Sequence, residues 1–344
     1  MEYGAIDLHM KKSHVRIVTE DGSVAWKGRV DTRREALAQV FGRRPRMRIL
    51  LESSTESEWV AQTLAELGHD VVVADPNYAP MYGSRNRRIK TDERDVTAMS
   101  EANRQGVFRR AHRVSATQRQ VRRELTVRKH LVRARTGAIS LLRALLRQEG
   151  LRLPSGSADR ILTRLTQVPI PAALEPVIAP LRAVIAELNT QMTVAEEQVE
   201  ARASTDPVAQ RLMTAPGVGP VVALAFQATL DDPARFGGDA RRASAFLGLV
   251  PSEDSSAERQ HKGHITKTGP TELRALVVQA SWVIWRGTSA DGAALRTWAH
   301  ALAARRGRRI AIIALARRLT RILLAMWRDG TDFTIRPRPI TVSA

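Results

Sequence analysis

The sequence predicts an α/β domain followed by a helical C-terminal region, and three observations support this fold class. Short apolar or alternating runs separated by turn residues extend to about residue 75, which is the pattern of strands. From about residue 115, apolar residues recur at helical spacing instead. Farther along, the sequence Pro-Gly-Val-Gly-Pro at 216–220 predicts a tight turn between two helices. The predicted domains are 1–110, 111–205 and 206–330, with an extended tail at 331–344.

The N-terminal region is predicted to form three strands and then alternating helices and strands. Strands are expected at 3–8, 14–19, 24–30, 46–51 and 71–74, and helices at 33–41 and 56–67. Turn-prone residues between the first three strands favour an antiparallel meander. The whole order predicts a mixed sheet with helices on its faces. A further helix is expected to begin near Thr91, whose side chain can cap it.

A long helix is predicted after residue 115. Leu125, Val132, Ile139 and Leu146 recur every seven residues, which favours a coiled coil, although arginines occupy other positions of the seam. Residues 150–171 include clustered Pro, Gly and Ser and are predicted to be a linker.

A second helix of this region is expected to follow Pro180. Its predicted apolar face consists of Leu181, Val184, Ile185, Leu188 and Met192. This helix is rich in Glu whereas the first is rich in Arg, so we expect a charge-complementary pair, within one chain or between two. An ordinary helical bundle core is an equally good interpretation.

Residues 207–288 are predicted to form a compact helical unit, and 293–328 to add two helices around Gly307. Within the first unit, residues 212–223 resemble a helix-hairpin-helix element. One helix would end at Pro216, Gly217 and Gly219 would make the turn, and the next helix would begin at Pro220. Backbone amides at such a turn can bind a phosphate oxygen. A plain turn between two helices is the alternative.

The charge of the chain points to a polyanionic partner. Lys and Arg number 54 and Asp and Glu 35, which gives a formal net charge of +19. Cys is absent, which excludes disulfides, thiolate zinc sites and cysteine nucleophiles. The apolar run 310–326 contains three arginines, so we expect no membrane partner and a cytoplasmic, nucleoid-associated location. A merely soluble basic surface is the alternative.

The basic residues are clustered. With aromatic residues at only 4%, contacts to the nucleic-acid backbone are expected to outweigh base stacking. The candidate nucleic-acid-binding residues are Arg85, Arg87, Arg88, Lys90, Arg122, Arg123, Arg128, Lys129, Lys262 and Lys267, with the backbone of Gly217 and Gly219.

Four acids stand out by their positions. Asp7 and Glu52 each end a predicted strand, and Asp92 and Asp95 lie three residues apart on one helix face. Carboxylates gathered at one edge repel one another unless a divalent cation neutralises them, and oxygen ligands suit Mg²⁺. We therefore expect two Mg²⁺ ions, which could hold the attacking and leaving oxygens of a phosphodiester. Taken singly, each acid could equally be structural; Glu93 and Asp75 are the next candidates.

Two further features bear on the chemistry. The histidines lack the spacings of zinc sites, so we do not expect them to bind a metal, although His9 is expected to border the acids. The polar segment 252–258 contains serines and is followed by Lys262 and Lys267. It is either a solvated turn or the location of a serine nucleophile, which would need activation by a metal or a base.

These motifs, in order along nearly the whole chain, resemble the DEDD-type transposases of the insertion-sequence one-ten family, which are relatives of pilin-gene DNA invertases. The resemblance rests on Ala-Ile-Asp at 5–7, a strand-end Glu and Lys-Thr-Asp-x-x-Asp at 90–95. Later matches are Pro-Gly-Val-Gly-Pro, Gly-Leu-Val-Pro at 248–251 and Gly-x-Ile-x-Lys-x-Gly at 263–269.

The resemblance implies a RuvC-like domain of the ribonuclease H fold in which Asp7, Glu52, Asp92 and Asp95 bind Mg²⁺. A coiled-coil linker then leads to a helical transposase domain whose serine forms a covalent phosphoserine with DNA. That serine corresponds to Ser256, with Ser255 as the alternative, because the usual Ser-Gly-Gly-Lys is replaced by Ser-Ala-Glu-Arg at 256–259.

The resemblance also implies a homo-dimer or tetramer and a structured non-coding bridge RNA that selects donor and target DNA. Two other functions remain compatible with the residues themselves. One is a RuvC-like, Mg²⁺-dependent junction endonuclease, and the other is a non-catalytic helix-hairpin-helix protein that binds nucleic acid.

Overall fold

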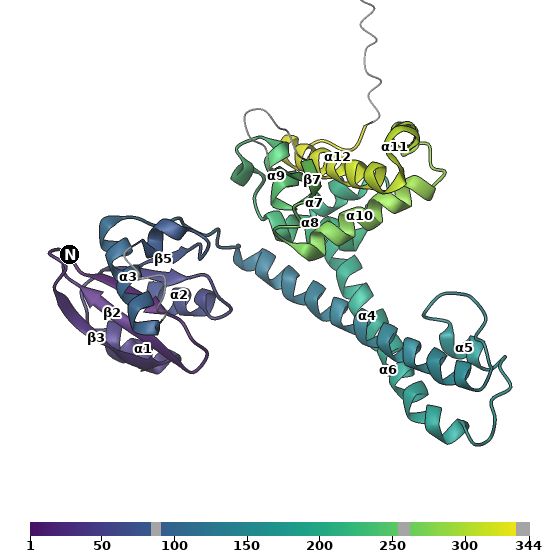
Figure 1. Cartoon of the computed structure of the whole chain (residues 1–344), viewed down its shortest axis with the longest axis horizontal. Coiled ribbons are helices and arrows are strands. Elements are labelled where there is room, and N and C mark those ends of the chain that lie inside the picture. Colours follow the sequence, from purple (N-terminus) through teal and green to yellow (C-terminus); the bar gives the residue numbers. More distant parts are fainter. Residues whose placement is uncertain (84–90, 254–261, 335–344) are drawn as a thin grey trace, which may run out of the picture. The chain divides into compact units, whose positions relative to one another are not determined.

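A five-stranded mixed sheet forms the centre of the N-terminal unit (Figure 1). Its strands are β1 (Tyr3–Asp7), β2 (Lys12–Val18), β3 (Val24–Asp31), β4 (Arg48–Glu52) and β5 (Asp70–Ala74), in the spatial order β3-β2-β1-β4-β5. The first three form an antiparallel meander, and β4 and β5 continue the sheet in parallel with β1. All five predicted strands and the mixed topology are confirmed.

This description comes from a computed structural model and covers residues 1–83, 91–253 and 262–334. The chain divides into two compact units, Met1–Arg113 and Val114–Ala344. The finer boundaries expected at 205/206 and 330/331 stay predictions. Several predicted functional residues lie outside the described residues: Arg85, Arg87, Arg88, Lys90, Ser255 and Ser256.

Both faces of the sheet are covered by helices. Helices α1 (Arg34–Phe41) and α2 (Ser57–Glu66) pack on one face, where Ile6, Ile49 and Leu51 are buried. Helix α3 (Asp92–Gln105) packs on the other, where Ala5 and Leu50 are buried. Successive residues of a strand point to opposite faces, so a strand buried on both sides needs an unbroken apolar run. This is why 49–51 is Ile-Leu-Leu.

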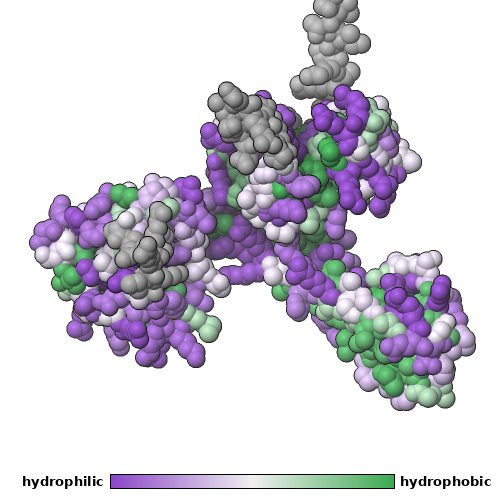
Figure 2. All heavy atoms as spheres, viewed as in Figure 1, coloured by the Kyte–Doolittle hydropathy of each residue, from purple (hydrophilic) through white to green (hydrophobic). Residues whose placement is uncertain are grey.

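The second unit begins with two long helices, α4 (Ala116–Gln148) and α6 (Glu175–Thr205). Arg128 Nη2 lies 2.9 Å from Glu196 Oε1, and Arg202 donates to both carboxylate oxygens of Glu124 at 2.7 Å. The charge-complementary pair expected from the sequence therefore forms within one chain. Apolar residues gather near the α5 end of this pair (green in Figure 2), where Leu141 and Val177 are exposed.

Three expectations for this region were wrong. Residues 150–171 are not a bare linker, because the short helix α5 (Ile161–Leu165) packs Ile161 and Leu165 against α4 and α6. Helix α6 begins at Glu175 rather than after Pro180, since Pro176 occupies the first turn and Pro180 forgoes only one helical hydrogen bond. Val184 is 50% exposed and does not belong to the buried face.

Where the structure describes it, the rest of the second unit contains six α-helices, the short 3-10 helix η2 (Pro233–Phe236) and one hairpin. The helices are α7 (Pro207–Met213), α8 (Pro220–Leu230), α9 (Ala240–Phe246), α10 (Thr271–Arg286), α11 (Ala293–Arg306) and α12 (Arg308–Asp329). Strands β6 (Pro251–Glu253) and β7 (Lys262–Ile265) form the hairpin. The two helices predicted around Gly307 are confirmed. None of the described helices is long and apolar enough to cross a membrane.

The turn between α7 and α8 packs against α10. Gly217 has φ +74°, and a Cβ there would lie 2.6 Å from the carbonyl oxygen of Ala280. Only glycine tolerates both the left-handed backbone and this close approach. Gly219 precedes α8 and has open space around it.

Candidate metal centre

The four predicted acids lie where three elements of the N-terminal unit meet. Asp7 is the last residue of β1 and Glu52 the last of β4, and the parallel register places both at the same edge of the sheet. Asp92 is the first residue of α3, and Asp95 lies one turn later, 7% exposed. The Thr91 side chain caps this helix by accepting the Arg94 amide, as predicted.

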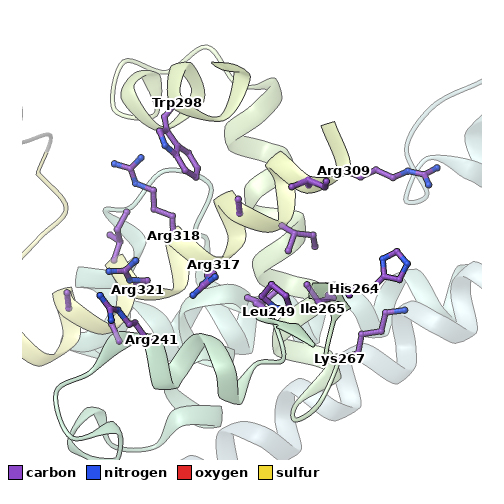
Figure 3. A pocket seen from close by; sticks show the side chains of 18 of the residues that line it. Arg241, Leu249, His264, Ile265, Lys267, Trp298, Arg309, Arg317, Arg318 and Arg321 are labelled. Carbon is purple, nitrogen blue, oxygen red and sulfur yellow. The ribbon is translucent and has the colours of Figure 1, made fainter. Parts of the chain in front are cut away.

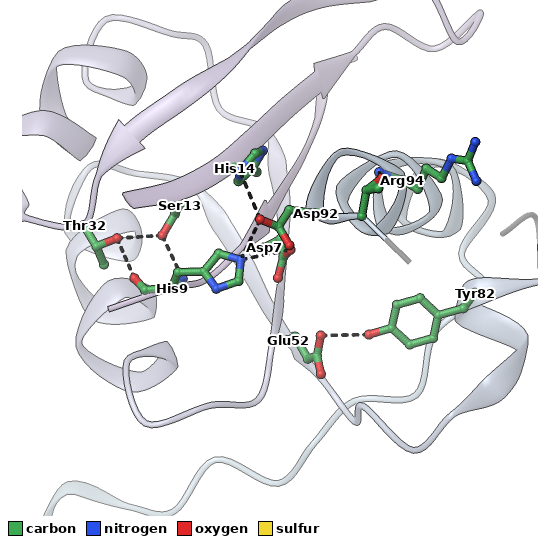
Figure 4. A network of polar contacts seen from close by, with 10 residues as sticks. Asp7, His9, Ser13, His14, Thr32, Glu52, Tyr82, Asp92 and Arg94 are labelled. Carbon is green, nitrogen blue, oxygen red and sulfur yellow. Dashed lines mark hydrogen bonds and ion pairs between the residues drawn. The ribbon is translucent and has the colours of Figure 1, made fainter. Parts of the chain in front are cut away.

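Two histidines join this group (Figure 4). His9 Nε2 lies 3.4 Å from Asp7 Oδ2 and 3.6 Å from Asp92 Oδ2. His14 Nε2 lies 3.4 Å from the same Asp92 oxygen. One ligand atom each from Asp7, His9 and Asp92 fall within 4.8 Å of one another, close enough to share a metal ion.

The other three carboxylates all act on the carboxyl group of Asp7. Burial raises the pKa of Asp7 above 3.8; His9 counteracts this, and Asp92, Glu52 and Asp95 raise it further. The Asp7 side chain is only 14% exposed. Several partly buried carboxylates are thus held close together at a cost that a divalent cation would remove.

Tyr82 lies beside Glu52 and forms a hydrogen bond with it. It ends the short 3-10 helix η1 (Ala79–Tyr82), and its Oη donates to Glu52 Oε2 at 2.9 Å (Figure 4). Burial, this hydrogen bond and the carboxylates of Glu52, Asp95 and Asp7 all raise the pKa of Tyr82. The phenol therefore stays protonated and acts as a hydrogen-bond donor that orients the Glu52 carboxylate.

The turn that carries His9 is held by two hydroxyl groups. Ser13 Oγ accepts the His9 amide at 3.3 Å, and Thr32 Oγ1 donates to the His9 carbonyl at 2.7 Å. The two hydroxyls lie 2.7 Å apart. These bonds fix the backbone that carries the imidazole beside Asp7, so the position of the ring is set by the protein itself.

The sequence missed His14 and Tyr82, and its expectation that the histidines bind no metal stays a prediction. His9 borders the acids as expected, but its ring nitrogen also lies within ligand range of them. The signal that could have found His14 is the hairpin register, since Asp7 pairs with His14 across β1 and β2. The two next candidates, Glu93 and Asp75, form other ion pairs. Glu93 pairs with Lys27, and Asp75 pairs with Arg109. Hydrogen bonds from the Asn77 amide and from Arg109 lower the pKa of Asp75.

Comparison with known protein families shows to which family this chain belongs. A model of the DEDD transposases of IS110 elements, described as "Transposase", matches residues 5–150. A second, described as "Transposase IS116/IS110/IS902 family", matches residues 209–295. A Pseudomonas aeruginosa protein named "Probable family 20 transposase" is 30% identical over 88% of this chain and 90% of its own. The chain belongs to the IS110/IS116/IS902 family of transposases.

Other relatives agree with this assignment. The transposase for insertion sequence element IS1328 of Yersinia enterocolitica is 27% identical over 96% of this chain and 97% of its own. The transposase for IS1111A of Coxiella burnetii is 29% identical over 81% of this chain and 77% of its own. This IS110-family transposase is therefore an enzyme of DNA transposition with a ribonuclease-H-like N-terminal sheet, and its DEDD domain implies a divalent metal site.

The basic residues predicted to bind nucleic acid differ in what they contact. In this transposase Arg122 donates to the carbonyl oxygens of Ala228 and Thr229 at 2.8 and 3.1 Å, and its burial lowers its pKa. Lys129 Nζ lies 2.7 Å from Glu272 Oε2, and Arg128 pairs with Glu196. These three cations are already engaged within the chain.

The remaining candidates are accessible or only partly described. Arg123 is exposed, and its guanidinium contacts Gln120 Oε1 at 3.4 Å. Lys267 is exposed with φ +55°, directly after the β6–β7 hairpin. Lys262 begins β7. Whether any of them binds nucleic acid stays a prediction.

Proposed function

We propose that this transposase cuts and rejoins DNA strands at a centre of two Mg²⁺ ions held by Asp7, Glu52, Asp92 and Asp95. The observation that supports this most is the convergence of carboxylates from β1, β4 and α3 at one edge of the sheet. Oxygen donors from carboxylates are the set that Mg²⁺ prefers. Bound Mg²⁺ would stabilise the charge that develops on the phosphodiester oxygens during transfer.

The surrounding residues position these carboxylates. His9 and His14 approach one Asp92 oxygen from two sides, which leaves the other oxygen for a cation. Tyr82 occupies one oxygen of Glu52 in the same way. The carboxylates of Asp92 and Glu52 are therefore oriented before any ligand arrives, which is the preorganisation that phosphoryl transfer requires.

The covalent step is assigned to Ser256, with Ser255 as the alternative. The family resemblance of 248–251 and 263–269 supports this assignment, and both serines belong to the segment between β6 and β7. The serine oxygen would bond to phosphorus as one strand oxygen leaves and takes a proton. Attack by the hydroxyl of another strand would reverse the step, releasing the serine and resealing the DNA.

A structured non-coding RNA and a second copy of the chain complete the proposal. The resemblance supports both, and the +19 charge supports the presence of RNA alongside DNA. The RNA would select donor and target, whereas the dimer or tetramer would bring two sets of catalytic residues to two strands.

The decisive experiment isolates the RNA first. RNA that co-purifies with the protein is sequenced, and recombination between donor and target DNA is then assayed with that RNA and Mg²⁺. We expect Ser256→Ala to abolish strand exchange and the protein–DNA adduct while RNA binding persists. If Ser256→Ala recombines normally and Ser255→Ala does not, Ser255 is the nucleophile. Full exchange with both serines replaced would eliminate the covalent-serine step.

A junction endonuclease is the second candidate, and one observation favours it. The acidic cluster lies wholly within Met1–Arg113 and needs no residue of the second unit to assemble. Mg²⁺-dependent cleavage of branched DNA that persists in the double serine variant, with no covalent adduct, would support this function instead.

A further inference from the structure

A large cavity in the second unit carries charge of the opposite sign to the metal centre. It has a volume of about 1970 Å³ and lies between α12, α11, α9 and the β6–β7 hairpin (Figure 3). We call it the α12 cavity, after the helix that supplies half of its lining residues. Small-molecule sites are about 300–1,000 Å³, so this space suits part of a polymer better than a metabolite.

Cations line the α12 cavity from several elements, and none of its lining residues, all of them described, is acidic. Those with a positive or ionisable side chain are Arg241, His264, Lys267, Arg309, Arg317, Arg318, Arg321 and Arg328. Arg241 from α9 and Arg321 from α12 both line the cavity (Figure 3), although they are distant in sequence. The fold therefore assembles this charge; the sequence does not contain it as a single run.

Most of these cations are not neutralised within the described part of the chain. There, Arg328 pairs with Asp329, and Arg318 lies over the Trp298 ring at 4.7 Å. By contrast, Arg241, Arg317 and Arg321 have no acidic partner among the described residues. Like charges held together repel, so such a cluster is more stable when a polyanion binds between its members.

The dimensions match a nucleic-acid backbone. From Arg309 to Arg328 the axis of α12 rises ~28 Å, at about 1.5 Å per residue. Phosphates of one DNA strand follow each other every ~3.4 Å along the duplex, so one segment can contact several of these arginines at once. The lining also includes apolar Leu249 and Ile313, and the large aromatic ring of Trp298 is covered by Arg318. The cavity therefore offers backbone contacts rather than a stacking platform.

We propose that the α12 cavity binds the phosphate backbone of DNA, with Arg317 and Arg321 as its central contacts. The choice of DNA over RNA rests on the proposed function, because Pro251 and His264 of the hairpin line this cavity and that hairpin flanks the segment with Ser255 and Ser256.

The test measures binding by the full-length protein in EDTA, so that no strand chemistry contributes. Fluorescence anisotropy follows a labelled DNA duplex of random sequence, and separately a labelled RNA hairpin, across a salt titration. The variant is Arg317→Gln/Arg321→Gln. Two lost phosphate contacts should weaken DNA binding on the order of 10- to 100-fold near 0.1 M salt and lower the salt slope by about 2.

The matched control is Arg305→Gln/Arg306→Gln, which removes the same charge from the exposed end of α11 outside the cavity. Circular dichroism checks that both variants are folded. Equal loss in the control would overturn the proposal, since net charge alone would then explain the effect. Loss of RNA affinity with unchanged DNA affinity would overturn the assignment to DNA. If the variant behaves as expected but the wild type shows no Mg²⁺-dependent strand exchange, the proposed function fails and the DNA site remains.

Discussion

The two units of this transposase concentrate opposite charges by different means. In the first unit, Asp7, Glu52 and Asp92 come from the ends of elements that meet at one sheet edge. In the second, Arg241 and Arg321 come from two helices that face one cavity. The acids are partly buried, and the pKa of Asp7 is raised by burial and by the other three carboxylates, whereas the two arginines are exposed to water.

This difference indicates what each region requires. Crowded, partly buried carboxylates are costly without a cation, so their arrangement is hard to explain except by metal binding. Exposed arginines cost little, because water screens them and their protonation does not change. Substitutions should therefore affect chemistry strongly in the first region and affinity in the second.

The largest effect is expected for Asp7→Asn. Removing one carboxylate from the centre of the cluster should lower the rate of strand exchange by roughly a thousandfold or more, since several kcal/mol of transition-state stabilisation depend on the bound metal. DNA and RNA affinity in EDTA should be unchanged. The measurement is recombination under saturating Mg²⁺.

Asp75→Asn is the matched control for this substitution. Asp75 also follows a strand of the sheet, but its carboxylate is held by Arg109 and by the backbone amide of Asn77. Strand exchange should survive in this variant. If Asp7→Asn retains wild-type exchange, the acidic cluster is not the catalytic centre.

Much of the first unit could be predicted from the sequence, because its apolar patterns are short and unambiguous. A strand that is buried on both faces needs an unbroken apolar run. An acid at the end of such a run, such as Glu52, is expected at an edge of the sheet. His14 and Tyr82 escaped prediction because their positions depend on pairing across the hairpin and on the packing of η1. Spacing along a chain does not encode such contacts.

The second unit was predicted less completely, for a physical reason. Packing of α5 against α4 and α6 compensates for the Pro and Gly residues that resemble a linker. In the sequence, Arg317, Arg318 and Arg321 of the α12 cavity were visible only as interruptions of the apolar run 310–326. These arginines line one cavity because α12 packs against α9 and α11, and the sequence of a single helix does not reveal this packing.

A smaller effect is expected for Tyr82→Phe, which removes the donor to Glu52 and nothing else from the cluster. Partners that orient metal ligands typically contribute about 10- to 100-fold in metal affinity. The Mg²⁺ concentration for half-maximal exchange should therefore rise by about tenfold, with a smaller change in the rate at saturation.

Tyr78→Phe provides the comparison for Tyr82→Phe, because Tyr78 lies in the same segment and packs under Arg109 away from the acids. Its Mg²⁺ dependence should equal that of the wild type. An unchanged Mg²⁺ requirement in Tyr82→Phe would mean that Glu52 needs no orientation by the phenol, or is not a ligand.

The destabilisation caused by crowding the carboxylates can also be measured, as a difference in melting temperature. Because the pKa of Asp7 is raised above 3.8, its ionised form is disfavoured in the folded protein. In EDTA at neutral pH, Asp7→Asn should thus melt a few degrees above the wild type. As pH falls through the raised pKa, the wild-type carboxyl takes up a proton and the difference should disappear. A lower melting temperature for Asp7→Asn at neutral pH would contradict this interpretation.

The smallest effect is expected where charges are paired instead of concentrated. Arg202 holds Glu124 through two hydrogen bonds and lowers its pKa from 4.5. A lowered carboxyl pKa stabilises the fold above the unfolded value, and this contribution is lost as pH falls through the folded pKa. Arg202→Gln should therefore lower the free energy of unfolding at pH 7 by about 1 kcal/mol or less, because the pair is partly exposed.

The pH dependence separates this pairing from general helix effects. The deficit of Arg202→Gln should begin to shrink below pH 4.5 and vanish below the lowered pKa of Glu124, where this carboxyl is protonated in both proteins. Arg133→Gln, an exposed change on α4 with no ion pair among the described residues, should show no such dependence. A deficit that stays constant in acid would mean that Arg202 contributes through packing of its stem, and that α4 and α6 are held by apolar contact rather than complementary charge.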